Sequence, residues 1–198
     1  MNKIEFIYFD VGGVIVRVDE ALEALRGRTN KTLSQIQQAL DQHASLGRKE
    51  KSQILEDFKT ELDMDFSGTY EELIELFTSA FMPIEETHTL IKELVGKYPI
   101  GILSNTEPQV LENSIKLGNI PDVAYKAIVA SCYEDVRKPD ERIYIIAEKK
   151  AEMSPEHILF IDDVEKNVDA AKARGWNGIV FDTKNPEASI KKIQELLG

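Results

Sequence analysis

Residues 6–15 read Phe6-Ile7-Tyr8-Phe9-Asp10-Val11-Gly12-Gly13-Val14-Ile15, an apolar run that ends at one acid followed by two glycines. The apolar part is short and rich in aromatic and β-branched side chains, which predicts a buried strand over residues 4–9. Asp10 then lies at the carboxyl end of that strand, where open α/β sheets bind their ligands. The alternative is an ordinary strand that ends in a turn.

The length and net charge of the chain limit the kinds of protein and of binding partner that fit this sequence. The chain has 198 residues, 42% of them hydrophobic and 30% charged, and a formal net charge of −11. This length can bury a core and suits one domain, or one domain with an inserted module. The acidic charge argues against a nucleic-acid partner, because phosphate backbones need concentrated Lys and Arg. A local cation or metal still allows a small phosphorylated substrate.

The single cysteine, Cys132, excludes an intrachain disulfide and favours a reducing compartment. No apolar stretch is long enough to span a membrane, and the N-terminus lacks a signal-peptide pattern. We therefore expect a cytoplasmic protein with no membrane partner. No feature of the sequence predicts an oligomeric state.

The pattern of apolar and polar residues changes after the first predicted strand. From about Asp19 to Met82 the chain is polar, with apolar residues at helical spacing and no strand candidate. Four helices are expected, and the Thr32–Gln35 spacing is typical of a capping box at the start of the second. We therefore predict a helical module over residues 17–84, inserted into a core formed by residues 1–16 and 85–198.

Strands alternate with helices in the remainder of the chain. The expected strands span residues 98–103, 127–130, 158–161 and 178–181. The expected helices span residues 86–97, 109–117, 165–174 and 185–197, and one further helix has Pro139 at its first position. This alternation predicts an α/β fold with a parallel sheet, right-handed crossovers and helices on both faces.

Polar residues cluster where these strands end. Asp10, Ser104 and the pair Asp162 and Asp163 follow three different strands, so the sheet brings them to one edge. Carboxylate oxygens suit Mg²⁺, and Asp10 can also act as a nucleophile. Ser104 can hold a phosphate oxygen, and Lys138 can neutralise developing negative charge.

Each of these residues also has a purely structural alternative. Asp163 precedes a helix and is placed to be its N-cap. Lys138 is placed to be a solvated loop lysine, and residues 104–106 to form a plain turn.

The order of these motifs resembles the haloacid dehalogenase-like hydrolase superfamily. The motifs are Phe9-Asp10-Val11-Gly12-Gly13-Val14, Leu103-Ser104-Asn105-Thr106, Arg137-Lys138-Pro139, and Ile161-Asp162-Asp163 followed by Asn167 and Ala170-Ala171. The resemblance spans nearly the whole chain. It implies a Rossmann-like, doubly wound core with an inserted α-helical cap, as in phosphatase-type members of subfamily I.

The resemblance also implies roles for individual residues. Asp10 would be the nucleophile, with Lys138 assisting catalysis. Phosphate would be bound by Ser104, Asn105 and Lys138, and Mg²⁺ by Asp10, the carbonyl of Gly12, Asp162 and Asp163.

Gly12 departs from the family pattern. Phosphatases of this family usually carry Asp at position 12, and this second acid protonates the leaving group and later activates water. A general acid–base group contributes about 10²–10⁴-fold to the rate, so its loss counts against fast hydrolysis of alkyl phosphates. Asp19 and the carboxylates of the cap are candidates to replace it. The resemblance extends to helical-cap members that have Gly here and include sugar-phosphate phosphatases.

The leading hypothesis is a Mg²⁺-dependent phosphatase that acts on a small phosphorylated metabolite, for example a sugar phosphate, through a phospho-Asp10 intermediate. A haloacid dehalogenase is an alternative for which Gly12 is harmless, because halide leaves without a proton, but it needs no metal. A second alternative is a weak or inactive member that binds a phosphorylated ligand or a protein. A receiver-type signalling domain fits less well, because its acid pair follows the first strand.

Overall fold

The computed structural model describes residues 3–43 and 50–198 and contains a five-stranded parallel sheet. Its strand order is β5-β4-β1-β6-β7, so β1 lies at the centre, with β4 on one side and β6 on the other. The strands are β1 (Phe6–Phe9), β4 (Ile100–Ser104), β5 (Ala127–Ala130), β6 (Ile158–Asp162) and β7 (Asn177–Val180). Helices cover both faces, which confirms the α/β, Rossmann-like prediction.

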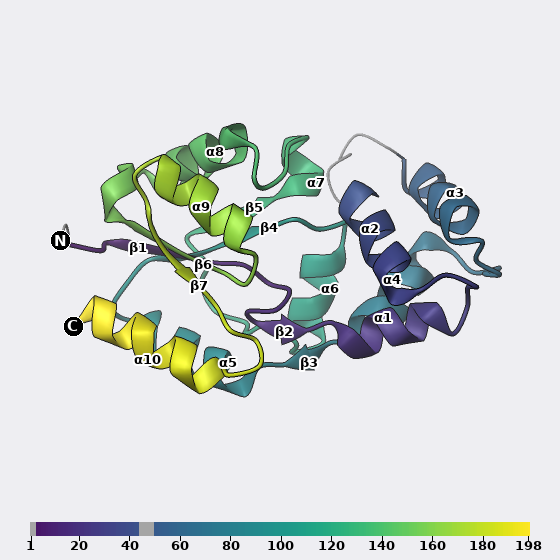
Figure 1. The fold of residues 1–198 in the computed structure, drawn as a ribbon, viewed down its shortest axis with the longest axis horizontal. Coiled ribbons are helices and arrows are strands. Elements are labelled where there is room, and N and C mark those ends of the chain that lie inside the picture. Colours follow the sequence, from purple (N-terminus) through teal and green to yellow (C-terminus); the bar gives the residue numbers. More distant parts are fainter. Residues whose placement is uncertain (1–2, 44–49) are drawn as a thin grey trace.

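Figure 1 shows α8 and α9 over one face of the sheet and α5 and α10 over the other. The helices of this part are α5 (Glu85–Leu94), α6 (Val110–Lys116), α7 (Ser131–Glu134), α8 (Glu141–Ala151), α9 (Glu165–Ala173) and α10 (Pro186–Leu197), with a 3₁₀ turn at Pro155–His157. Helices connect the strands of the sheet, which all run in the same direction. The carboxyl ends of the strands therefore share one edge of the sheet.

The central strand is buried on both faces, which explains its continuous apolar sequence. All four residues of β1 are 0% exposed. Tyr8 stacks on Trp176, with ring centroids 5.8 Å apart, and its hydroxyl donates to the carbonyl of Ala147 at 2.9 Å. Ile7 and Phe9 belong to the larger core on the opposite face. The strand that carries Asp10 is therefore held by packing on both sides.

The inserted segment folds into helices, as the apolar spacing predicts. They are α1 (Asp19–Arg26), α2 (Leu33–His43), α3 (Lys51–Leu62) and α4 (Tyr70–Ser79). They pack on one another in sequence, and α1 also packs on α4. The capping box at the start of α2 is present. The backbone N–H of Gln35 donates to Thr32 Oγ1 at 3.3 Å, and the backbone N–H of Thr32 donates to the side-chain Oε1 of Gln35 at 2.9 Å.

A short antiparallel ribbon closes the base of this insert. It pairs β2 (Val16–Arg17) with β3 (Met82–Pro83), so the chain enters and leaves the insert side by side. The expectation of no strand up to Met82 was wrong, because two residues are too few to show alternation and their partner lies at the other end of the insert. These contacts support our proposal that residues 17–84 form a cap on a core of residues 1–16 and 85–198.

The start of α8 also differs from the expectation. Asp140 is its N-cap, and the Asp140 side chain accepts from the backbone N–H of Arg142 at 2.9 Å. Pro139 therefore precedes the helix and is not its first residue, because an Asp side chain can satisfy the first amides better than the residues before it. The short helix α7 was not expected. Among the described helices, none is long and apolar enough to cross a membrane.

Candidate active site and metal centre

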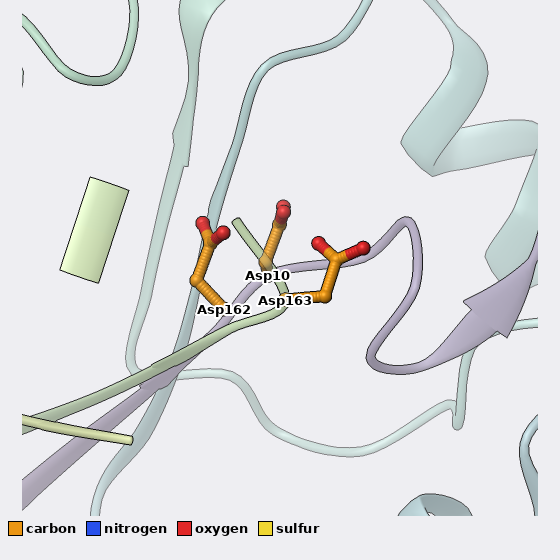
Figure 2. Close-up of side chains that lie close together, drawn as sticks. All are labelled: Asp10, Asp162 and Asp163. Carbon is orange, nitrogen blue, oxygen red and sulfur yellow. The ribbon is translucent and has the colours of Figure 1, made fainter. Parts of the chain in front are cut away.

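Three aspartates meet at the carboxyl edge of the sheet. Asp10 follows β1, Asp162 is the last residue of the adjacent β6, and Asp163 comes next. One ligand oxygen from each lies within 4.8 Å of the others, and Figure 2 shows the three carboxylates projecting to the same side. Clustered carboxylate oxygens are the donors that a hard cation such as Mg²⁺ prefers. The side chains present therefore fit such a cation.

Lys138 connects two of these acids. Its Nζ lies 2.9 Å from Asp10 Oδ1 and 2.6 Å from Asp162 Oδ2, and it donates to the carbonyl of Leu103 at 2.9 Å. The side chain is 1% exposed, so Lys138 is not a solvated loop lysine. Burial acts to lower its pKa, but Asp10 and Asp162 outweigh burial and hold the pKa above its usual value. A permanent cation therefore lies between the two carboxylates.

Opposing effects of burial and of neighbouring charges set the pKa of Asp10. Burial raises the pKa of Asp10 to about 7, with Lys138 lowering it and Asp162 and Asp163 raising it further. Its Oδ1 accepts from the Val11 amide at 2.7 Å as well as from Lys138. A cation bound beside it would favour the ionised form, which is the form that acts as a nucleophile.

Asp162 serves as an anchor for the cluster. Besides Lys138, it accepts from the amide of Val164 at 2.8 Å and from Nδ2 of Asn167 at 3.1 Å to each oxygen. The N-cap position of α9 is Val164, so the structure does not support the alternative that Asp163 is only a helix cap. Burial instead raises the pKa of Asp163 to about 6. Asn167 had no role assigned from sequence, although its place in the motif that begins with the acid pair is a usable signal.

Asn105 holds the backbone of Lys138 in place. Its Nδ2 donates to the Lys138 carbonyl at 3.0 Å, and its Oδ1 accepts from the Lys138 amide at 2.8 Å. Both ends of this amide side chain are therefore engaged by the lysine. We propose that Asn105 positions Lys138, and its role in binding phosphate stays a prediction.

A cavity of about 560 Å³ opens over the cluster. It is lined by six of the residues singled out from sequence, namely Asp10, Gly12, Ser104, Asn105, Lys138 and Asp163. Asp162 is 0% exposed and lies behind them. Asp19, an exposed candidate for the missing acid, lines the same cavity, as do Arg17, Lys166 and Lys184, which sequence reasoning missed. Arg17 reaches the cavity because β2 places it there, and no motif signals that placement.

Gly13 makes room for the carboxylate of Asp163. Its φ is +73°, and a Cβ built on it would lie 2.1 Å from Asp163 Oδ2. We expect Gly13→Ala to displace Asp163 and to weaken Mg²⁺ binding about 10- to 100-fold, the usual cost of disturbing the support of a metal ligand. Isothermal titration with Mg²⁺ measures this directly.

Gly96→Ala is the matched control, because a Cβ at Gly96 meets nothing within 4 Å. It should bind Mg²⁺ as the wild type does. Equal Mg²⁺ affinity in both variants would contradict a role for the Gly13 turn in placing Asp163.

Several solved structures are similar in fold to this chain. A HAD-like family hydrolase from Porphyromonas gingivalis matches with a TM-score of 0.78 and 26% identity, over 99% of this chain and 98% of its own. A HAD family enzyme from Bacteroides thetaiotaomicron, in complex with magnesium and inorganic phosphate, matches with a TM-score of 0.74 and 18% identity, over 91% and 95%. L-2-haloacid dehalogenase from Xanthobacter autotrophicus matches with a TM-score of 0.70 and 19% identity, over 88% and 76%.

A curated relative is much longer than this chain. It is acyl-CoA dehydrogenase family member 10 from Mus musculus, 32% identical over 74 residues, and the match covers 37% of this chain and 7% of the relative. The family model for haloacid dehalogenase-like hydrolases matches residues 4–175, which include β1, the insert and every aspartate of the cluster. The chain therefore belongs to the haloacid dehalogenase-like hydrolases.

Proposed function

We propose that the protein is a Mg²⁺-dependent phosphatase that acts on a small phosphorylated metabolite through a phospho-aspartate at Asp10. The observation that carries the proposal is the arrangement around Asp10. Its carboxylate lies in a metal-capable cluster with Asp162 and Asp163, and it contacts the buried Lys138. A related enzyme that holds magnesium and inorganic phosphate supports the same chemistry in this fold.

The chain's own residues account for two chemical steps. In the first, an Asp10 oxygen forms a bond to phosphorus while the bond from phosphorus to the leaving oxygen breaks, and that oxygen takes the electron pair. In the second, water attacks the phosphorus and the bond between phosphorus and Asp10 breaks, so that the carboxylate is restored and inorganic phosphate leaves. The proton that the attacking water gives up balances the proton that the leaving oxygen takes from solvent. Ser104 would hold a phosphoryl oxygen, and Lys138 would balance the negative charge on Asp10.

Mg²⁺ would be held by Asp10, Asp162 and Asp163, together with the carbonyl of Gly12. When bound, it neutralises charge on the phosphoryl group and on Asp10, so that two anions can approach. Asp162 is already fixed by Lys138 and Asn167, which prearranges the site for the cation.

A haloacid dehalogenase is the second candidate, because one structural neighbour has that activity and Gly12 removes an acid that halide loss does not need. The acid cluster favours the phosphatase, since dehalogenation needs no metal. The deciding experiment measures phosphate release from p-nitrophenyl phosphate with Mg²⁺ or with EDTA, and chloride release from chloropropionate.

We expect Mg²⁺-dependent phosphate release and no chloride release. Chloride release without metal would replace the phosphatase by the dehalogenase. Failure of both reactions, with Mg²⁺ and phosphate bound, would favour a member of the family that only binds its ligand.

Gly12 offers a test by gain of function. A Cβ at Gly12 meets only Val18 Cγ1 at 3.8 Å, and its φ is not in the left-handed region, so a side chain fits there. We expect Gly12→Asp to raise kcat/KM for an alkyl phosphate about 10-fold or more by supplying the missing acid, and to change an aryl phosphate less. Steady-state kinetics on both esters measure the difference.

Gly12→Asn is the matched control, because it has the same size without the acid. It should leave the alkyl phosphate at the wild-type rate or below. Equal gains for Asp and Asn would show that the effect is not acid–base catalysis.

A further inference from the structure

A second, smaller cavity adjoins the candidate active site. It has a volume of about 120 Å³ and shares Gly12, Val18, Gln37, Ser104 and Asn105 with the larger cavity. A group attached to a phosphate held at Ser104 can therefore reach it directly. The cap supplies one side of this cavity through α1, α2 and α4, and the segment after β4 supplies the other.

The lining of this cavity is mostly apolar. The apolar side chains are Val11, Val18, Leu22, Leu40, Phe77, Phe81 and Val110. Two polar side chains of the lining already make hydrogen bonds within the protein. The Asn105 side-chain amide donates to the Lys138 carbonyl, and the Thr106 hydroxyl donates to the Glu107 carbonyl. Hydroxyl groups of a sugar would lose water here against an apolar wall, which costs free energy.

Charge at this cavity disfavours a second anionic group. Glu107 lies in its lining and is 7% exposed, whereas the cations near the site, Arg17, Lys166 and Lys184, line the larger cavity and not this one. A carboxylate or second phosphate on the organic group would therefore lie beside the acidic side chain of Glu107 and against apolar side chains. An uncharged group fits the smaller cavity best.

Size limits this group further. An apolar protein cavity of about 150 Å³ holds one benzene molecule. A cavity of about 120 Å³ that is open to the active site therefore suits a group of up to about one ring. The absence of an acid at Gly12 also favours an aryl ester. An aryl oxygen leaves as a stabilised anion and needs little help from a general acid.

We propose that the substrate is a phosphomonoester whose organic part is a small uncharged apolar group, an aryl group in preference to a sugar, and that this group binds between Leu22, Phe77 and Val110. This proposal rests on the phosphatase function and names its substrate class. It replaces the sugar phosphate as the expected metabolite.

Binding of phosphonates tests the cavity without turnover. We expect phenylphosphonate to bind the Mg²⁺-loaded protein at least about 10-fold more tightly than methylphosphonate, because the ring leaves water for an apolar wall. Leu22→Trp fills the cavity from the cap, where Leu22 is half-buried, and should abolish this preference. Leu33→Trp places the same residue on an exposed part of the cap and should keep it.

Leu22→Ala is the second variant, and it enlarges the cavity. We expect it to admit naphthylphosphonate at least about 10-fold more tightly than the wild type does. Equal binding of methyl- and phenylphosphonate in the wild type, or an unchanged preference in both Leu22 variants, would overturn the proposal.

Kinetics separate this proposal from the phosphatase function itself. We expect kcat/KM to be highest for phenyl phosphate. Cyclohexyl phosphate should show a similar KM with a lower kcat, and a sugar phosphate a higher KM. Turnover with no preference for the phenyl ester overturns the apolar cavity and keeps the phosphatase. A phosphonate preference without any turnover keeps the cavity and overturns the phosphatase.

Discussion

Asp10→Asn abolishes phosphate release, with kcat falling by a factor on the order of 10⁴–10⁶, as expected when a covalent nucleophile is removed. Asn has the same shape, and its oxygen can still accept from Lys138, so the site keeps its geometry while losing the attacking carboxylate. The measurement is Mg²⁺-dependent phosphate release from p-nitrophenyl phosphate. Asp169→Asn, at an exposed position on α9, is the control and should keep the wild-type rate.

Stability separates this loss from unfolding. Burial raises the pKa of Asp10 from 3.8 to about 7, so its charged form is disfavoured in the folded protein. The stability that this group contributes in its neutral form is complete below pH 4 and is lost as pH rises towards 7. In EDTA, the melting temperature of Asp10→Asn should therefore rise relative to wild type over this range. A variant that melts well below wild type at pH 8 would contradict this account of the charge.

Lys138→Met removes the cation between Asp10 and Asp162. Two buried carboxylates then lose their shared partner, and breaking a buried ion pair costs about 3–5 kcal/mol. We expect the melting temperature to fall by about 10 °C or more. Because Lys138 lowers the pKa of Asp10, that pKa should also rise above about 7 in the variant, which leaves less of the nucleophile ionised. We expect kcat to fall at least about 10³-fold.

Lys150→Met is the matched control for this substitution. Lys150 pairs with Glu134 at the surface, and its side chain is 42% exposed. Exposed pairs contribute about 0–1 kcal/mol, so the melting temperature should change by no more than a few degrees and kcat should not change. Equal destabilisation by the two substitutions would mean that the buried position of Lys138 has no special importance.

The regular elements were largely predictable because they depend on local pattern. The apolar run before Asp10 and its later counterparts predicted buried strands, and β1, β4, β5, β6 and β7 are all present. Helical spacing in the insert predicted α1 to α4. The ribbon of β2 and β3 was missed because each strand is two residues long and pairs only with the distant end of the insert.

The meeting of the acids at one sheet edge was predictable from the sequence, whereas the burial of Lys138 and the cations that line the cavity were not. Strand ends that share one edge of a parallel sheet gave the convergence of Asp10, Ser104 and the acid pair. Nothing local to Arg137-Lys138-Pro139 indicated that Lys138 would be buried between two acids. Asn105, at the end of another strand, makes two hydrogen bonds to the backbone of Lys138, and no local pattern records this contact.

The sequence by itself determined the order of strands and helices, the positions of the acids at strand ends and the absence of an acid at Gly12, since these follow from local pattern and residue identity. Only the tertiary structure decided which charges are buried together, which groups fix Asp162, and how the cap helices meet the core to form the apolar cavity beside Ser104. The physical reason is that burial, pKa and cavity shape depend on contacts between segments far apart in the chain, and no local pattern records those contacts.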